Sequence, residues 1–226
     1  MIARVIYCSN LPQHKKHPTN NEKDTPMKRY LSFALGLISL SILTGCGIKE
    51  TTLKPQSYAL EPHVKLSRFS NPTKDVLKIA RIDANSGLNT RAILYKKEGA
   101  LLPYKYGTWS ETPSLKLQYL ITEALQDQNH FTAVVSGTSM ASNTLVLEPV
   151  LANFEEVFKE DGTSYINVVL RARLIEVKSG NVLGSKKFSH QKEVTNTNGA
   201  QGSVEAFDAA TATLIQELCV WVSSVR

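Results

Sequence analysis

The sequence has little cysteine, and this excludes a fold held together by disulfides. Cys8 and Cys46 lie within the first 46 residues, which leaves Cys219 as the single cysteine of the remaining sequence. One thiol has no intramolecular partner, and no group of cysteines and histidines has the spacing of metal ligands. We therefore expect no bound metal or other cofactor, and a fold that depends on an ordinary hydrophobic core.

Clustered positive charge is also missing from most of the chain. The whole sequence has 26 Lys and Arg against 20 Asp and Glu, but residues 1–45 contain six of the bases and two of the acids. The remainder has 20 bases against 18 acids, a net charge of +2. Nucleic-acid binding requires a clustered basic face, and no glycine-rich phosphate-binding motif is present. We therefore expect no nucleic-acid partner.

A secretory signal is indicated at residues 27–45. Lys28 and Arg29 precede an apolar run from Leu31 to Leu43 that carries no charge. The run is shorter than the roughly 20 residues needed to cross the hydrocarbon core of a membrane. Its length and flanking charges are typical of the hydrophobic region of a signal peptide.

The signal ends on the string Leu43-Thr44-Gly45-Cys46. This string resembles the lipobox of bacterial lipoproteins, in which the cysteine thiol is acylated and becomes the mature N-terminus. The resemblance implies that Cys46 anchors the protein to a membrane, which takes two or more acyl chains at about 0.8 kcal/mol per buried methylene. The alternatives are an ordinary signal peptide with a chance cysteine, or a buried apolar helix.

Four parts follow from these boundaries. Residues 1–26 are polar and lack periodicity, so we expect a disordered leader, or a segment that is not translated if the true start is Met27. Residues 27–45 are the signal peptide. Residues 46–74, rich in Lys, Pro, Ser and Thr, are expected to be a tether between the lipid and the domain. Residues 75–226 have the size of a single domain.

Hydrophobic periodicity predicts several strands and two amphipathic helices. The helices run from Pro113 to about Gln128, with Thr112 as the N-cap, and over roughly 204–222. Pro149 favours an edge position or a bulge for the strand that contains it. The expected strands cover residues 58–60, 76–82, 90–97, 131–135, 144–158, 164–177 and 182–192.

The last three strands are expected to be consecutive and antiparallel, with a hairpin turn at Lys178–Asn181. One helix precedes them and the other follows. Both helices can bury their apolar faces if they pack on one face of a single sheet. We therefore predict an α+β two-layer sandwich, with a mostly antiparallel sheet and two amphipathic helices on one face.

The string Gly137-Thr138-Ser139-Met140-Ala141 matches the nucleophile motif of subtilisin-like proteases. A Ser-His-Asp site also needs a base and an orienting carboxylate, and His63, His130 and His190 have none of that family's sequence settings. Such residues are also the ordinary ones of a surface loop. We favour a loop and no catalytic residue, with an envelope serine hydrolase that uses Ser139 as a distant alternative.

Four acidic residues lie close together in the sequence. The acids Glu155, Glu156, Glu160 and Asp161 cluster near a strand end and its turn. Such a cluster is more often solvated than paired for acid and base catalysis, so we interpret it as a solvated tip.

Three aromatic residues, Tyr104, Tyr106 and Trp109, lie in a stretch with Gly and Pro that we interpret as a connection before the first helix. Aromatic side chains concentrate at interface hot spots, so all three are candidates to contact a partner protein or a lipid. We favour a core position for Trp109 and leave both interpretations open for the tyrosines.

The order of these elements covers the whole chain after the signal. It includes Cys46, Tyr58–Leu60, Val76–Ile82, Tyr104–Trp109 with Pro113 and its helix, Leu145–Phe154, the hairpin at Lys178–Asn181 and the helix from Phe207 to Trp221. In this order the chain resembles the ABC-type transport auxiliary lipoprotein family, which includes the PqiC/YmbA-like lipoproteins of MCE (mammalian cell entry) transport systems.

The resemblance implies a non-enzymatic lipoprotein of a Gram-negative envelope that faces the periplasm. It would work with an MCE protein and an ABC transporter permease and ATPase to move lipids or other hydrophobic molecules between membranes. Gly47 after Cys46 implies sorting to the outer membrane, with the inner membrane as the alternative, and the family implies a homo-oligomer. The second hypothesis is a lipoprotein that assists outer-membrane assembly or activates a cell-wall synthase.

Overall fold

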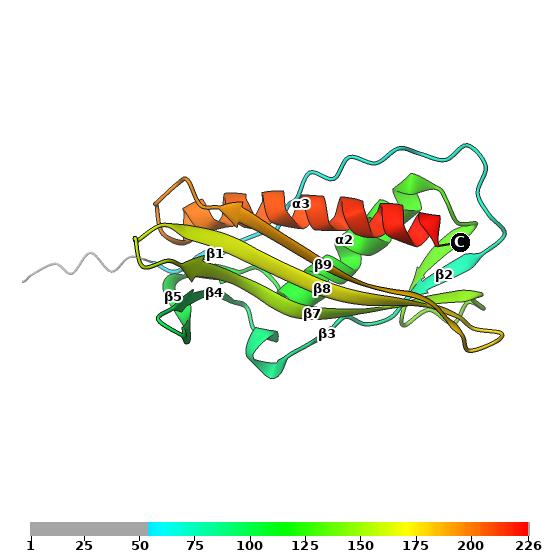
Figure 1. Cartoon of the computed structure of the whole chain (residues 1–226), viewed down its shortest axis with the longest axis horizontal. Helices are drawn as coiled ribbons and strands as arrows, with labels where there is room; N and C mark the ends of the chain where they lie inside the picture. The colour runs from blue at the N-terminus through cyan, green and yellow to red at the C-terminus, as the bar shows by residue number, and fades with distance from the viewer. Residues whose placement is uncertain (1–53, 226) are drawn as a thin grey trace, which may run out of the picture. The chain divides into compact units, whose positions relative to one another are not determined.

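A mixed β-sheet and two α-helices make up residues 54–225, the part of the chain that the computed structural model describes (Figure 1). The signal peptide, the lipobox and Cys46 lie outside these residues, so their assignments stay predictions. In chain order the elements are β1 (Gln56–Tyr58), β2 (Val76–Ile79), β3 (Asp83–Ala84), the short 3-10 helix η1 (Ser86–Leu88), β4 (Ala92–Lys97), β5 (Ala100–Trp109), α2 (Pro113–Gln128), β6 (Ala133–Ser136), β7 (Leu145–Phe158), β8 (Ser164–Glu176), β9 (Val182–Glu193) and α3 (Ala200–Ser224).

Strand β7 lies in the middle of this nine-stranded sheet. On one side β8 pairs with β7 antiparallel along its whole length, and β9 pairs antiparallel with β8. On the other side β2, β3 and β4 follow one another along β7, and all three are parallel to it. Beyond them, β6 is parallel to β2, β5 is antiparallel to β4, and β1 is parallel to β5.

The predicted α+β class is confirmed, but the expectation of a mostly antiparallel sheet is wrong because the sheet is mixed. The hairpins of β7, β8 and β9 join strands that are neighbours in the sequence, and these follow the prediction. The parallel pairs join distant segments. Strands β6 and β7 both pair with β2, but α2 lies between β2 and these two strands in the sequence. A helical connection between strands of one sheet is the usual way to make them parallel.

The face of the sheet that makes the core is clearest in β8. Arg171 and Arg173 are exposed, and the residues that alternate with them are buried, as the sequence pattern predicted. Those buried residues are Ile166, Val168, Leu170, Ala172 and Leu174, each no more than 1% exposed.

The two helices share one hydrophobic core with the sheet. Helix α2 has the predicted bounds: Thr112 occupies the N-cap position, without a side-chain cap hydrogen bond, and Asn129 ends the helix in the left-handed conformation with a φ of 56°. Helix α3 lies along β8 and β9 (Figure 1) and also packs against α2. None of the described helices is long and apolar enough to cross a membrane.

Pro149 lies in an interior strand, not at an edge, and the register shift of β7 falls just after Leu151. The Leu147 carbonyl accepts a hydrogen bond from the Ala80 N–H on the β2 side (2.9 Å), and strand alternation directs the Pro149 nitrogen to the same side. There the pairing with β2 ends at Leu147 and the pairing with β3 begins at Val150. The missing N–H of the proline therefore falls in a gap between two partner strands.

The chain between β1 and β2, which belongs to the segment expected to act as a tether, lies against α3. Leu60 is buried, and the Glu61 N–H donates to Asp208 Oδ1 (2.8 Å). Further along, Gln216 Nε2 donates to the Lys65 carbonyl (2.6 Å). These contacts fix the start of the described chain to the last helix.

Candidate functional site

An open cleft of about 940 Å³ lies where β1, β4 and β5 meet the loop before α3. We call it the aromatic cleft, because five aromatic side chains form much of its lining. They are Tyr58, Tyr95, Tyr104, Tyr106 and Phe158, and the lysines Lys54, Lys97 and Lys105 lie among them.

The aromatic rings of the cleft support one another. Tyr95 packs against Tyr104 with ring centroids 5.0 Å apart, and its edge meets Phe158 at 5.6 Å. Lys105 Nζ lies 5.1 Å from the centroid of Tyr106, a cation–π distance. The cleft therefore has an apolar aromatic surface, with the positively charged lysine side chains at its edges.

A buried carboxylate holds Tyr104, one of the residues that line the cleft. Glu156 in β7 is 2% exposed and accepts three hydrogen bonds from hydroxyl groups: from Tyr104 Oη (2.6 Å), Ser164 Oγ (2.5 Å) and Ser203 Oγ (2.5 Å). Because Ser203 belongs to the first turn of α3, this one side chain ties β5, β8 and α3 together. Burial, and next the hydrogen bond to Glu156, raise the pKa of Tyr104 well above its usual value.

The solvated tip expected for Glu155 and Glu156 is therefore wrong, because both side chains are buried. Glu155 accepts hydrogen bonds from the side-chain amides of Asn153 (3.0 Å) and Asn167 (2.9 Å). Buried carboxylates are found where such donors are present, and for the two glutamates the donors come from β5, β7, β8 and α3. Asp161, by contrast, is exposed in the turn after β7.

The connection expected at residues 104–109 is wrong as well, since these residues belong to strand β5. Pro103 misled the prediction, but it pairs with Leu94 of β4 at a point where β1 does not yet border β5. Gly107 has a packing role: a Cβ there would lie 2.5 Å from the Cβ of Ala200. Glycine therefore allows the start of α3 to approach the sheet beside the cleft.

The three aromatic residues that the sequence indicated occupy two different kinds of position. Tyr104 and Tyr106 line the cleft, and Tyr106 is 40% exposed. Trp109 is 2% exposed and packs edge-on against Phe154 and Phe207, which is the core position that we favoured.

Sequence reasoning missed the rest of the aromatic cleft. Tyr58, Tyr95 and Phe158 come from β1, β4 and β7, and only the sheet pairing brings them beside β5. No spacing within the sequence indicates this group.

Ser139 lies in the loop between β6 and β7. Its hydroxyl accepts a hydrogen bond from the Ala141 N–H (3.2 Å), and its own N–H donates to the Ser136 carbonyl (3.0 Å). These are contacts of a turn. Among the described residues, no group of histidine, cysteine and acidic side chains is arranged to hold a metal.

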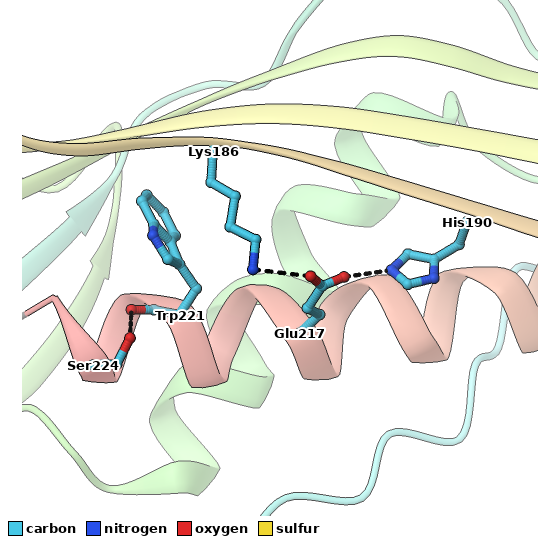
Figure 2. A network of polar contacts seen from close by, with 5 residues as sticks. All are labelled: Lys186, His190, Glu217, Trp221 and Ser224. Carbon is cyan, nitrogen blue, oxygen red and sulfur yellow. Dashed lines mark hydrogen bonds and ion pairs between the residues drawn. The ribbon is translucent and has the colours of Figure 1, made fainter.

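A second groove, of about 780 Å³, runs between the chain after β1 and the last turns of α3. Glu217 of α3 lies at this groove and accepts from Lys186 Nζ (2.9 Å) and His190 Nε2 (2.7 Å) of β9 (Figure 2). The hydrogen bond from Lys186, and then that from His190, lower the pKa of Glu217. The three side chains are partly exposed, so we expect the network to contribute at most about 1 kcal/mol to holding α3 on β9.

His130 is a core residue and not a ligand. It is 8% exposed and lies between the rings of Phe69 and Phe131, with centroids 4.6 and 4.8 Å away. Neither ring nitrogen has a hydrogen-bond partner among the described residues. Burial lowers the pKa of His130, and the negative charge of Asp75 acts in the opposite direction.

We expect His130 to make the protein less stable as the pH falls below about 6.5, the usual pKa of an unfolded histidine. Its pKa is lower in the folded state, so the unfolded chain takes up the proton first, and the free energy of unfolding falls on acidification. Urea unfolding of the wild type and of His130→Leu at about pH 7.5 and about pH 5.5 measures this. The variant should lose less stability than the wild type, and equal losses would contradict the expectation.

Comparison with known proteins identifies the class. Residues 58–219 match the family model described as the ABC-type transport auxiliary lipoprotein component. The chain therefore belongs to this family, as the order of its elements predicted. No curated protein matches the sequence significantly.

Solved structures share the fold. A protein from Xanthomonas campestris assigned to the family DUF330 is 19% identical, with a TM-score of 0.67, and the match covers 75% of this chain and 96% of that one. A second crystal structure, of an uncharacterized protein, is 14% identical with a TM-score of 0.57, over 75% of this chain and 99% of that one. The PelC dodecamer from Paraburkholderia phytofirmans is 13% identical over 70% of this chain and 92% of that one, but its TM-score of 0.42 is too low to support an argument.

Membership of the family has three consequences. It implies association with a transporter and a location in the cell envelope, and the family is one of auxiliary transport lipoproteins, not of enzymes. At identities below 20%, the matching structures establish the fold alone.

Proposed function

We propose that this protein is a membrane-anchored periplasmic lipoprotein and an auxiliary component of an MCE-type ABC transporter that moves lipids or other hydrophobic molecules across the envelope. The observation that carries the proposal is the family match over residues 58–219. Its partners would be an MCE-family protein, the transporter permease and its ATPase, and a homo-oligomer is part of the proposal.

The aromatic cleft supports a binding role for the folded domain. Tyr106 offers an exposed ring together with a hydroxyl group, and Tyr104, whose hydroxyl is bonded to Glu156, offers its ring, which suits contact with a partner protein or a lipid chain. Trp109 is buried in the core against Phe154 and Phe207, so in this proposal it does not touch the bound molecule. Binding and positioning, without chemistry on the molecule, is what an auxiliary component requires.

The anchor of the proposal is Cys46, with the outer membrane as the proposed location because Gly47 follows it. Cys46→Ser should abolish palmitate incorporation and release the protein from the membrane fraction, because no thiol then remains at the lipobox to be acylated. Cys219→Ala, which removes the buried thiol of α3, is the matched control and should leave labelling unchanged. Palmitate labelling that persists in Cys46→Ser would refute the anchor.

Co-purification tests the transport role. The full-length protein, tagged at its C-terminus and extracted in mild detergent, should recover an MCE protein together with a permease and an ATPase. A Tyr106→Ala variant should recover less of them if the cleft is the contact surface, whereas Leu115→Ala, an exposed apolar residue on α2, should not. Recovery of an outer-membrane β-barrel or a cell-wall synthase in their place would contradict the proposal.

A further inference from the structure

The tip of the β4–β5 hairpin, residues 96–103, carries two adjacent leucines beside a charged turn, Lys96-Lys97-Glu98-Gly99. Every residue of the tip is exposed. Leu101 and Leu102 have 45% and 40% of their surface exposed. Adjacent large apolar side chains that stay exposed beside a turn indicate a surface that contacts something else.

The two leucines lie on opposite faces of the hairpin. Leu101 pairs with Lys96 and Leu102 with Tyr95, and neighbouring residues of a strand project to opposite sides. A protein partner that covers one face would leave the other leucine in water. A lipid layer surrounds an inserted tip and shields both.

Aromatic and charged residues of the kinds that a membrane surface favours surround the two leucines. Tyr95, Tyr104 and Tyr106 lie behind the leucines, and tyrosine is enriched at the level of lipid headgroups. Positive side chains near a membrane are attracted to anionic headgroups. Around the tip and the aromatic cleft there are five lysines, Lys54, Lys96, Lys97, Lys105 and Lys159, against four acids, the exposed Glu98, Glu160 and Asp161 and the buried Glu156.

The tip also lies at the end of the domain where the described chain begins. Lys54 lines the same cleft as Lys97 and Lys105, and Figure 1 shows β4 and β5 at the end from which β1 starts. Lys54 is the eighth residue after Cys46, and eight extended residues span at most about 29 Å. A lipid on Cys46 would therefore hold this end of the domain close to the bilayer.

We propose that the β4–β5 tip is a second membrane contact, in which Leu101 and Leu102 enter the interfacial layer of the bilayer that holds Cys46. The lysines around the cleft then face anionic headgroups, and the aromatic cleft opens toward the membrane surface. The inference rests on the anchoring part of the proposed function, and it adds the orientation of the domain.

A fluorescent thiol label tests the contact. Within residues 54–225 the native thiol is Cys219, which is fully buried, and burial raises its pKa to about 12. The mature acylated protein with Leu101→Cys can therefore be labelled at the tip with an environment-sensitive dye. It is then reconstituted into vesicles of phosphatidylethanolamine and phosphatidylglycerol, with and without brominated acyl chains.

The dye at residue 101 should show a blue-shifted emission and strong quenching by the brominated lipid. Met140→Cys is the matched control: Met140 is 99% exposed in the loop before β7, at the other end of that strand from its pairing with β4. The dye at residue 140 should show neither effect. Adding Leu102→Asp should reduce the quenching at residue 101.

Each other outcome has a definite meaning. Protein that floats with the vesicles while the dye at residue 101 reports water overturns the inference and leaves the anchor intact. A blue shift without quenching by brominated lipid places the tip against protein, such as a second copy of this chain, and also overturns it. Protein that carries no palmitate and does not float refutes the Cys46 anchor, and the inference fails with it.

Discussion

Replacing Glu156 with alanine is expected to lower the free energy of unfolding by about 3–5 kcal/mol, because three buried hydroxyl groups lose their acceptor. The donors are Tyr104, Ser164 and Ser203, all within 2.6 Å of the carboxylate. Leaving a buried polar group unpaired costs about 1–3 kcal/mol. We expect each of the three hydroxyl groups to cost an amount near the lower end of this range. Ser203, for example, already has the Gly199 carbonyl as a second acceptor (3.2 Å).

Urea unfolding of Glu156→Ala beside the wild type measures this loss. Glu148→Ala is the matched control in the same strand: Glu148 forms a 2.9 Å ion pair with Arg173, but both side chains are well exposed, so the loss should stay below about 1 kcal/mol. Glu156→Gln keeps one carbonyl acceptor, so its loss of stability should lie between the losses of Glu156→Ala and Glu148→Ala. If Glu156→Ala loses no more than Glu148→Ala, the carboxylate does not hold β5, β8 and α3 together beside the aromatic cleft.

The second large effect is expected for Phe207→Ala, with a loss of about 3–5 kcal/mol. Phe207 is fully buried in α3, stacks on Phe154 with centroids 4.6 Å apart, and meets Trp109 edge-on at 5.2 Å. Truncation removes the ring and leaves a cavity between α3, β5 and β7. The neighbours are themselves large aromatic side chains held in the sheet, so they cannot collapse into the space.

Val220→Ala in the same helix is the control for Phe207→Ala. Val220 is 60% exposed, and an exposed substitution of this kind changes stability by about 0.5 kcal/mol or less. Urea unfolding followed by circular dichroism measures both variants. A loss for Phe207→Ala near that of Val220→Ala would mean that α3 does not depend on this aromatic cluster for its place on the sheet.

Local sequence signals predicted the helices and the two hairpins of β7, β8 and β9, but not the hairpin of β4 and β5. Pro113 and Asn129 delimit α2 because proline fits a first helical turn and asparagine tolerates the left-handed conformation. The alternation in β8 predicted its buried face because one face of that strand meets the core and the other meets solvent. These properties depend on neighbours in the chain, so a single sequence contains them.

The parallel pairs and most of the site depend on distant neighbours instead. Leu77 pairs with Leu145 and Gln56 with Gly107, and nothing in either segment specifies its partner. For the same reason Glu156 looks like a surface acid in the sequence, since its hydroxyl donors come from three separate elements. Tyr104 and Tyr106 were found because aromatic residues stand out in a short stretch, whereas Tyr58 and Tyr95 needed the sheet.

The place of α3 in this architecture has a consequence for the order of folding. Phe207, Leu214 and Leu218 of the core all belong to α3, a helix of 25 residues that follows every strand of the sheet in the sequence. The sheet is therefore covered only after α3 has been made. β1 and β2 also wait for partners made much later, and pairing between distant segments is slow because loop closure precedes any gain from contacts. During synthesis the chain therefore has no complete core to close upon. If residues 27–45 act as the predicted signal peptide, this late closure of the core favours export of the chain before it folds.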